Sequence, residues 1–156
     1  MEVRRVRREE LRAAHETRLA TWRVAYRGIV PDDHLAALVL DDESLSRFEQ
    51  RFDEGIGRTF AAFDDDAVVG MSVAGRCRDE DREGQEELYA IYVLPSHWGA
   101  GVGQALWEAS APFTSLWVLE ANARARAFYA RNGFRPDITK EITFGAPLTE
   151  VRYVLA

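Results

Sequence analysis

The sequence contains only one cysteine, Cys77, and no long apolar run. A single thiol excludes an internal disulfide framework and a zinc site built from several thiolates, so we expect no metal and a reducing, cytoplasmic environment. No stretch approaches the roughly 18 apolar residues of a membrane-spanning helix. The N-terminal sequence MEVRRVRREELRAAHE lacks the apolar segment of a signal peptide. We therefore expect a soluble protein that does not have a membrane as its partner.

An excess of positive charge is also absent, because the formal net charge is −6. General nucleic-acid binding needs a basic surface, so we expect no nucleic-acid partner. A local basic pocket for one anionic ligand stays compatible with this charge. The length of 156 residues, of which 47% are hydrophobic, suits a single domain over residues 1–156 with a substantial core.

The spacing of apolar residues changes along the chain from helical to strand-like and back. It predicts a helix from about residue 8 to 26, and two further helices that begin near Pro31 and Asp41. Alternation predicts a hairpin in RTFAAFDDDAVVGMSVAGRC. The other expected elements are strands at 2–7, 87–93 and TSLWVLE, helices at 101–111 and about 123–132, and a final hairpin from FRPDITKEITF to LTEVRYVLA. This order predicts an α/β (α+β) fold, with a largely antiparallel sheet and one strand–helix–strand unit near its middle.

Three glycines, Gly99, Gly101 and Gly103, alternate within VLPSHWGAGVGQALW, between an expected strand and an expected helix. Glycine tolerates positive φ and lets another group approach the backbone closely. The first N–H groups of a helix have no internal partners, and the helix dipole favours an anion there. The segment can therefore bind a diphosphate through its main chain. An ordinary glycine-rich connection between strand and helix would give the same pattern.

Two other kinds of nucleotide-binding loop do not match this segment. A dinucleotide-binding loop needs G-x-G-x-x-G directly after a strand, but Leu106 stands at the third glycine position. Five residues, from Leu94 to Trp98, also separate the strand from the first glycine. Too few residues follow Glu120 for a doubly wound sheet. The G-x-x-x-x-G-K-[ST] loop is absent from the sequence.

A second motif lies in LEANARARAFYARNGF, residues 119–134. With the glycine segment, it resembles the GNAT superfamily of acetyl-CoA-dependent N-acetyltransferases. The [Q/R]-x-x-G-x-[G/A] signature of that superfamily reads WGAGVG here, so Trp98 replaces a polar side chain while the main-chain donors remain. The N-x-x-A-x-x-F-Y-x-x-x-G-F pattern is matched by Asn122, Ala125, Phe128, Tyr129, Gly133 and Phe134. The segment TWRVAYRGIVPDDHL also looks like the N-terminal helices of such enzymes, so the resemblance extends over most of the chain.

The resemblance implies a GNAT-like central mixed, mostly antiparallel sheet of about six to seven strands, flanked by about four helices. It implies an enzyme that transfers an acetyl group from acetyl-CoA to a primary amine of a small molecule or peptide, directly within a ternary complex, and it allows a homodimer. The alternative is a non-catalytic acyl-CoA-binding regulatory module on the same fold, which the departure at Trp98 favours. The residues implied to bind the cosubstrate are Tyr92, Val93, Gly99, Ala100, Gly101, Val102, Gly103, Gln104, Asn122 and Tyr129.

Some of these residues have more specific implied roles. In the family, the pantetheine arm of the cosubstrate pairs like an extra strand with the main chain near Tyr92 and Val93. Asn122 would reach an amide of that arm, or would only cap the helix that follows it. Arg124 and Arg126 flank the start of the same helix, where a solvated helix face explains them better than contact with phosphates.

Tyr129 is the predicted general acid. A phenol with a pKa of about 10 stays protonated at neutral pH and can donate to a developing thiolate. The family has a tyrosine at this position, although a core aromatic beside Phe128 is the alternative. By resemblance, Glu87 is the base that takes the amine proton, directly or through water, but its neighbour Glu86 also fits a solvated strand start. If the strand is regular, one face carries Glu87, Tyr89, Ile91 and Val93.

The acceptor side is expected in the N-terminal helices, which form the acceptor wall in this superfamily. The candidate residues there are Trp22, Tyr26, His34 and Phe48, although aromatics at helical spacing also suit a core. The acidic residues Asp32 and Asp33 could attract a cationic amine. The sequence does not identify that amine.

Overall fold

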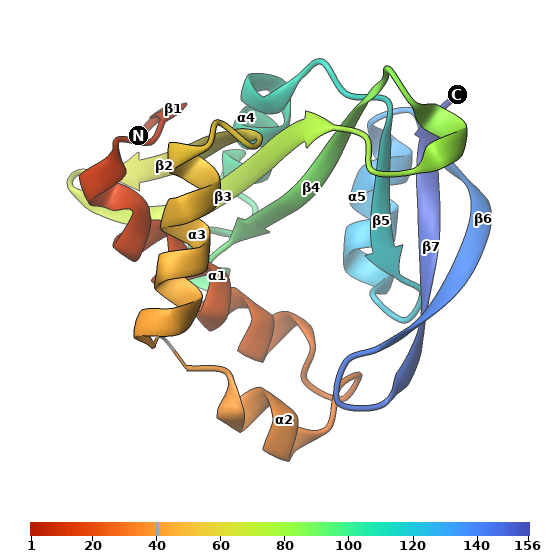
Figure 1. Cartoon of the computed structure of the whole chain (residues 1–156), viewed down its shortest axis with the longest axis horizontal. Helices are drawn as coiled ribbons and strands as arrows, with labels where there is room; N and C mark the ends of the chain where they lie inside the picture. The colour runs from red at the N-terminus through yellow and green to blue at the C-terminus, as the bar shows by residue number, and fades with distance from the viewer. Residues whose placement is uncertain (40) are drawn as a thin grey trace.

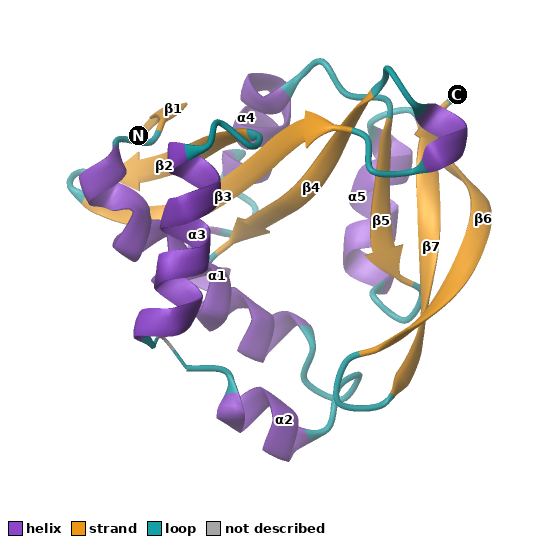
Figure 2. Ribbon diagram, viewed as in Figure 1, coloured by secondary structure: helices purple, strands orange, loops and turns teal. Residues whose placement is uncertain are grey.

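The computed structural model describes residues 1–39 and 41–156 of the chain. Within these residues, seven strands form one sheet and five α-helices flank it (Figures 1 and 2). The strands are β1 (Glu2–Arg5), β2 (Arg58–Asp64), β3 (Ala67–Arg76), β4 (Glu86–Val93), β5 (Ser115–Leu119), β6 (Phe134–Thr143) and β7 (Pro147–Leu155). The helices are α1 (Leu11–Ala25), α2 (Asp32–Ala37), α3 (Asp42–Asp53), α4 (Val102–Ser110) and α5 (Ala123–Arg131). The predicted mixed fold class is therefore confirmed.

The strands follow the order β1-β2-β3-β4-β5-β7-β6 across the sheet. Neighbouring strands pair antiparallel, except that β4 and β5 pair parallel through the β4–α4–β5 unit. This unit is the predicted strand–helix–strand crossover, and the predicted hairpins are β2–β3 and β6–β7. The local signals that set the helix starts also hold, since Asp41 caps α3 and Asn122 caps α5 through their side chains.

The sheet opens between β4 and β5. Only Glu87 with Ser115 and Leu88 with Leu116 pair across these two strands in the described part of the chain. Beyond those pairs the strands diverge, and Figure 1 shows the two halves of the sheet separating toward α1 and α2. Because the other edge of β4 pairs with β3 as far as Val93, the gap exposes one unpaired edge of β4.

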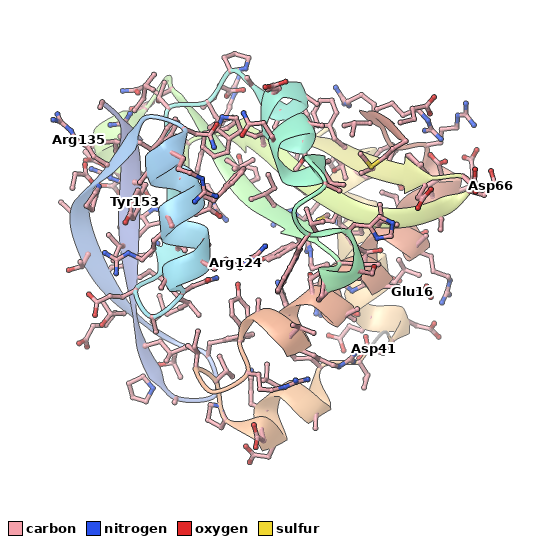
Figure 3. The ribbon with its side chains drawn as sticks, turned by 180° about the vertical axis from the view of Figure 1, so that it is seen from behind. Glu16, Asp41, Asp66, Arg124, Arg135 and Tyr153 are labelled. Atoms are coloured by element: carbon pink, nitrogen blue, oxygen red, sulfur yellow. The ribbon has the colours of Figure 1, made fainter. Side chains whose placement is uncertain are left out.

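The helices cover both faces of the sheet. Against one face, α1 and α3 pack through Leu11, Ala14 and Phe48 onto Met71 and Val73 of β3. Against the other face, α4 packs through Val102 and Leu106, next to Val69. Seen from behind in Figure 3, α4 and α5 lie in front of the sheet.

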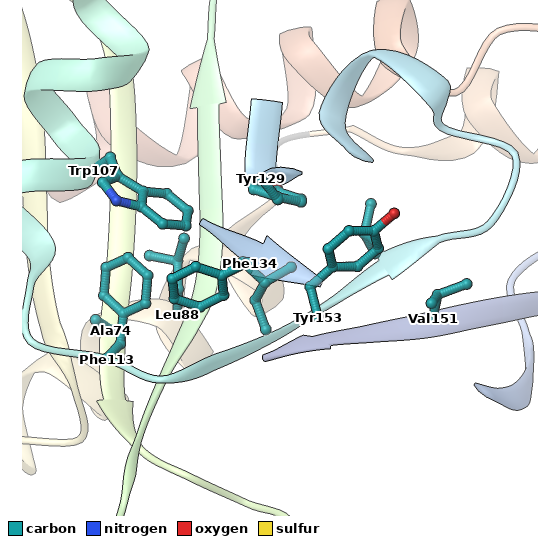
Figure 4. Close-up of a cluster of buried hydrophobic side chains, with 10 residues drawn as sticks. Ala74, Leu88, Trp107, Phe113, Tyr129, Phe134, Val151 and Tyr153 are labelled. Atoms are coloured by element: carbon teal, nitrogen blue, oxygen red, sulfur yellow. The ribbon is translucent and has the colours of Figure 1, made fainter. Parts of the chain in front are cut away.

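A larger cluster holds α4, α5 and the second half of the sheet together. Trp107 of α4 lies at its centre, with the rings of Phe113 and Phe134 edge-on at 4.6 and 5.0 Å between centroids. Tyr129 stacks on the same indole at 5.8 Å, and Tyr153 of β7 lies 6.1 Å from Tyr129 (Figure 4). This packing fixes α5, and with it Tyr129, against the place where the sheet divides.

The expectation of a regular strand over 87–93 is wrong. The register between β3 and β4 shifts after Val73, which pairs with Ala90, to Ala74, which pairs with Leu88, so Tyr89 is an extra residue in a bulge. Downstream of the bulge the alternation of side chains is reversed. Tyr89 and Tyr92 therefore pack together with the α1–α3 side, whereas Ile91 and Val93 face α4.

Candidate active site

A cavity of about 870 Å³ occupies the gap between β4 and β5, and we call it the splay cavity. Its walls are β4, the segment from His97 to Gln104, β5 and α5, together with Tyr26 at the C-terminal end of α1 and Glu150 of β7. The predicted cosubstrate residues found in its walls are Tyr92, Val93, Gly99, Gly101, Val102, Gly103, Gln104, Asn122 and Tyr129. Within the described residues, Ala100 and the predicted base Glu87 are not part of these walls.

The glycine segment exposes its backbone to this cavity. Gly99 and Gly101 have φ of +76° and +82°, a region in which side chains larger than glycine are strained. A Cβ at either position would meet open space, so the main chain there is uncovered. Gly101 also occupies the N-cap position of α4. Because glycine has no side chain, it supplies no side-chain acceptor for the first N–H groups of the helix. The N-terminal turn of α4 is therefore left for an external group.

The backbone donors of this segment support the same conclusion. The first helical hydrogen bond of α4 runs from the Ala105 N–H to the Gly101 carbonyl, 3.0 Å. Among the described residues, no backbone or side-chain acceptor pairs with the N–H groups from Gly99 to Gln104. Free N–H groups at the positive end of a helix dipole bind anions such as phosphates. The geometry thus fits the predicted main-chain diphosphate site.

The unpaired edge of β4 forms a second set of main-chain groups in the cavity. In the described structure, β5 pairs with no β4 residue beyond Leu88, so the edge from Tyr89 to Val93 faces the cavity. At its end, the Trp98 indole N–H donates to the Val93 carbonyl at 2.8 Å. An extended chain with alternating amide donors and acceptors could pair with such an edge like a further strand.

Asn122 and Gln104 form contacts within the protein. The Asn122 side-chain oxygen accepts from the Ala125 N–H at 3.2 Å, which is the helix cap considered in the sequence analysis. The Gln104 side-chain amide donates to the side-chain oxygen of Asn132, the residue that follows α5, at 2.9 Å. Both side chains line the cavity, and the Gln104 contact connects α4 with the end of α5.

The arginines at the start of α5 differ in their surroundings. The Arg124 guanidinium lies 3.8 Å from the ring centroid of Trp98, and both residues line the cavity. Figure 3 shows Arg124 between α5 and the segment that precedes α4. Arg126 instead donates to the Tyr153 hydroxyl at 3.0 Å and to the Glu120 carbonyl at 2.9 Å. Trp98, which replaces the polar residue of the family signature, thus forms a cation–π contact with Arg124 beside the cavity.

Tyr129 presents its hydroxyl to the splay cavity from a buried ring. The residue is 8% exposed, and no group in the described structure hydrogen bonds to its hydroxyl. Burial raises the pKa of the Tyr129 phenol, and the neighbouring Tyr92 raises it further. The phenol therefore stays protonated across the neutral range and can act only as a proton donor there.

Glu87 is buried and forms an ion pair with Arg78. Its carboxylate accepts from the Arg78 guanidinium at 2.7 Å and from the Arg78 backbone N–H at 3.1 Å. Arg78 also lies over the Tyr89 ring at 4.4 Å. No local pattern indicated this ion pair, because Arg78 lies in the loop between β3 and β4, nine residues before Glu87.

The carboxylate that lines the splay cavity is Glu150 on β7, which was absent from the predicted site. Burial raises the pKa of Glu150, and Lys140, 3.8 Å away on β6, lowers it in part. Burial likewise raises the pKa of Tyr26, with Tyr92, Tyr129 and Glu150 adding to the shift. Three phenols and one carboxylate thus converge from four different elements, a grouping that no local motif could signal.

The predicted acceptor wall is divided between two places. Trp22 packs edge-on against Tyr92 at 6.1 Å and against Phe144, in the turn between β6 and β7, at 5.8 Å. His34 of α2 contacts the same Phe144 ring at 4.7 Å, so this turn closes over the N-terminal helices. Phe48 instead packs with His15 between α1 and α3. Asp32 and Asp33 are exposed and lie outside the walls of the splay cavity.

Comparison with known proteins assigns the family. Residues 55–136 match the family model of the acetyltransferase (GNAT) domain, and the chain belongs to this family of acetyltransferases. It is 28% identical over 162 residues to the uncharacterized N-acetyltransferase YuaI of Bacillus subtilis (strain 168), an alignment that covers 96% of this chain and 89% of YuaI. It is also 28% identical over 134 residues to the uncharacterized N-acetyltransferase Rv2669 of Mycobacterium tuberculosis (strain ATCC 25618 / H37Rv), covering 81% and 83% of the two chains.

The fold also occurs in solved structures. PaiA N-acetyltransferase from Thermoplasma acidophilum, in complex with coenzyme A, superposes with a TM-score of 0.74 over 98% of both chains, at 19% identity. A ribosomal-protein-alanine N-acetyltransferase from Brucella melitensis superposes with a TM-score of 0.69, at 20% identity, over 99% of this chain and 100% of that chain. At these identities the likeness concerns the fold. No helix within residues 1–39 and 41–156 combines the length and the apolar character needed to span a membrane.

Proposed function

We propose that the protein transfers the acetyl group of acetyl-CoA to a primary amine by direct attack within a ternary complex. The observation that carries this proposal is the splay cavity, in which free N–H groups at the start of α4, an unpaired strand edge and the Tyr129 hydroxyl share one space. The N–H groups from Gly99 to Gln104 would bind the diphosphate of acetyl-CoA. The edge from Tyr89 to Val93 would pair with the amides of the pantetheine arm.

The chemistry follows from the residues around the thioester end of that arm. The amine nitrogen forms a bond to the acetyl carbonyl carbon, and the bond between that carbon and sulfur breaks. Tyr129 gives its proton to the departing sulfur, which leaves as the neutral thiol. The amine gives up one proton to a carboxylate or to water, and solvent restores the phenol.

Two carboxylates are candidates for this proton. Glu87 is the base implied by the family resemblance, but in this fold its charge is paired with Arg78. Glu150 lies in the cavity wall with Tyr26 and Tyr129. Burial raises the pKa of Glu150, so its carboxylate is a stronger base than a carboxylate with an ordinary pKa. We favour Glu150, acting directly or through a water molecule.

The pH dependence of kcat/KM separates these two candidates. A base must be ionised, so kcat/KM falls as the pH drops through the pKa of the base. Glu150→Gln should lower kcat/KM by about a hundredfold and remove this fall at low pH, the acidic limb of the pH profile. Glu87→Gln, the matched variant on β4, should retain the limb. If Glu87→Gln removes the limb and Glu150→Gln does not, Glu87 is the base.

The proposal as a whole is tested by thiol release from acetyl-CoA across a panel of amines. We expect release that depends on both substrates and a matching acetylated product by mass spectrometry. Tight binding of coenzyme A without any amine-dependent release would favour the non-catalytic acyl-CoA-binding module. A homodimer and a cytoplasmic location stay predictions from the sequence.

A further inference from the structure

A second cavity, of about 490 Å³, lies between α1, α3 and the adjoining face of β3 and β4. We call it the α1–α3 cavity. Its walls include the aromatic rings of Trp22, Phe48, Tyr89 and Tyr92, and the head groups of four arginines. The glycine segment and the 119–134 motif contribute none of the residues that line it, so we derive its function from the chemistry of its walls.

Unpaired nitrogen atoms are concentrated in this cavity. In the described part of the chain, five buried side-chain polar atoms have no hydrogen-bond partner, and three of them are His15 Nδ1, Arg18 Nε and Trp22 Nε1. These three residues are spaced at i, i+3 and i+7, so they share one face of α1, and all three line the cavity. The Arg18 and Trp22 nitrogens can only donate. Buried donors without acceptors are rare in folded proteins, so this face of α1 is suited to an acceptor group from outside.

The charged side chains around the α1–α3 cavity are mostly positive. It is lined by Arg18, Arg47, Arg51 and Arg78, and among the described residues Asp41 is the one acidic side chain in its walls. Asp41 is already used, since its carboxylate accepts the Ser44 N–H at 2.7 Å as the cap of α3. Arg47 pairs with Glu43 and Arg78 pairs with Glu87, which leaves Arg18 and Arg51 without an ion-pair partner in the described structure. A chain with a net charge of −6 thus keeps a positive pocket.

Arg18 is the centre of this positive pocket. Its guanidinium lies 4.9 Å from the ring centroid of Phe48 and 6.0 Å from that of Trp22. Burial lowers the pKa of Arg18, although the Tyr92 phenol partly offsets this, and the nearby charge of Arg51 lowers it further. Arg18 is half-buried. Water in the cavity can bond to its guanidinium but cannot neutralise it, and a partly desolvated charge without a counter-charge is costly. A bound anion would remove that cost.

The α1–α3 cavity adjoins the splay cavity. Tyr89, Ala90 and Tyr92 line both of them, and Trp22 packs against Tyr92 where they meet. Along α1, Arg18 precedes Tyr26 by eight residues, which corresponds to about 12 Å at 1.5 Å per residue. Arg18 therefore faces the first cavity while Tyr26, two turns later, faces the second, beside Glu150 and Tyr129.

We infer that the acceptor amine carries an oxyanion, a carboxylate or a phosphate, which binds Arg18 and the Trp22 indole N–H in the α1–α3 cavity while the amine lies in the splay cavity. The inference rests on the proposed function and names the substrate class. Arginine suits either oxyanion, because its planar guanidinium can donate two parallel hydrogen bonds. Two helical turns separate the two ends of the site, so a spacer of several bonds fits better than an α-amino acid.

A series of ω-amino acids tests the inference. Thiol release from acetyl-CoA is measured with glycine, β-alanine, 4-aminobutyrate and 6-aminohexanoate, and with the neutral control 6-aminohexanamide. We expect kcat/KM to rise along the acids and to exceed that of the amide by about tenfold or more, as for a charge-assisted hydrogen bond. The corresponding aminoalkyl phosphates, in a parallel arm, show which oxyanion the cavity prefers.

Variants of α1 assign the effect to Arg18. Arg18→Gln should lower kcat/KM for 6-aminohexanoate by about ten- to a hundredfold and leave the amide nearly unchanged. Arg12→Gln, an exposed position on the same helix, should affect neither substrate. Without ligand, Arg18→Gln should melt at or above the Tm of the wild-type protein, because it removes an unpaired charge. An arginine that only supported the fold would lower Tm when removed.

Binding measured apart from catalysis separates this inference from the proposed function. 6-Aminohexanoate should raise the Tm of the wild-type protein and of Arg12→Gln, but not that of Arg18→Gln. If this shift appears and no amine releases thiol, the oxyanion site stands and the transferase proposal fails. If amines are acetylated but the acids show neither preference nor dependence on Arg18, the inference about the acceptor is wrong.

Discussion

The splay cavity and the α1–α3 cavity meet at Tyr92 but are built from different parts of the chain. The splay cavity offers main-chain N–H groups, an unpaired strand edge and the Tyr129 hydroxyl. The α1–α3 cavity offers side-chain nitrogens and arginines on an apolar background. Main-chain groups suit a ligand that every member of a family shares, whereas side chains can change from one member to another without altering the fold.

The two regions also differ in how much they are prepared before a ligand binds. The glycine segment holds its N–H groups in place through the α4 helix, so binding there needs little rearrangement. Arg18, in contrast, is half-buried and has no ion-pair partner among the described residues, and a bound anion would compensate its charge. The first region is therefore expected to set the chemistry, and the second to select the acceptor.

The largest expected effect is that of Tyr129→Phe in the splay cavity. Removal of the phenol proton should lower kcat by about a hundredfold or more, as for loss of a general acid. The ring would remain packed on Trp107, so Tm and the Kd for coenzyme A should change little. Stopped-flow thiol release and calorimetric titration give these values. An unchanged kcat would remove Tyr129 from the mechanism.

In the α1–α3 cavity, the protonation of His15 should limit stability in acid. Burial lowers the pKa of His15 to about 4, Arg18 and Arg47 act in the same direction, and Asp41 opposes them. The unfolded chain, with an ordinary histidine pKa of about 6.5, binds the proton first, so stability falls as the pH drops from about 6.5 to 4.

We expect this loss to reach about 3 kcal/mol near pH 4 for the single histidine. Urea unfolding of the wild-type protein and of His15→Gln, compared at each pH, isolates it from the titration of the carboxylates. The difference between the two should shrink by that amount toward pH 4. A difference that stays constant with pH would mean that His15 is readily protonated in the folded state.

Gly101→Val tests the main-chain anion site. Valine at φ +82° is strained, and its side chain would stand over the first turn of α4. The Kd for coenzyme A should rise by about tenfold or more. Gly84→Val provides the matched control, because Gly84 has φ +85° in an exposed loop outside both cavities. If both variants bind coenzyme A as the wild-type protein does, the glycine segment does not hold the diphosphate.

The smallest expected effect belongs to the cavity mouth. Arg124→Gln should weaken coenzyme A binding by about two- to fivefold at low salt, because an exposed cation near phosphates is strongly screened. The difference should shrink at high salt. Arg135→Gln, an exposed arginine on β6, should have no effect. Equal behaviour of the two variants would show that Arg124 only packs on Trp98.

Much of the splay cavity could be predicted from the sequence because its signals are local. Alternating glycines before a helix predict an anion site through φ and free N–H groups, and Asn122 and Tyr129 lie within one short motif. The element order was predicted for the same reason, since caps, hairpins and apolar spacing are read within a few residues. The pairing of β4 with β5 followed from the strand–helix–strand rule.

The rest depends on contacts between distant segments. The bulge at Tyr89 has no marker in the sequence, yet it decides which side chains of β4 face α1. Glu150 reaches the splay cavity only because β7 lies beside β5. Arg18 has the spacing of an ordinary amphipathic helix, and only the folded arrangement shows that no carboxylate of residues 1–39 and 41–156 forms an ion pair with its guanidinium. A site built from side chains of distant segments has no local sequence pattern by which it could be predicted.

A crystal structure of the protein with coenzyme A tests the central claim most directly. We predict that the diphosphate oxygens accept hydrogen bonds from main-chain N–H groups between Gly99 and Gln104, with the pantetheine arm along the edge of β4 and its sulfur beside the Tyr129 hydroxyl. Coenzyme A bound elsewhere, with the start of α4 left without a ligand and the gap between β4 and β5 filled by side chains, would contradict the account.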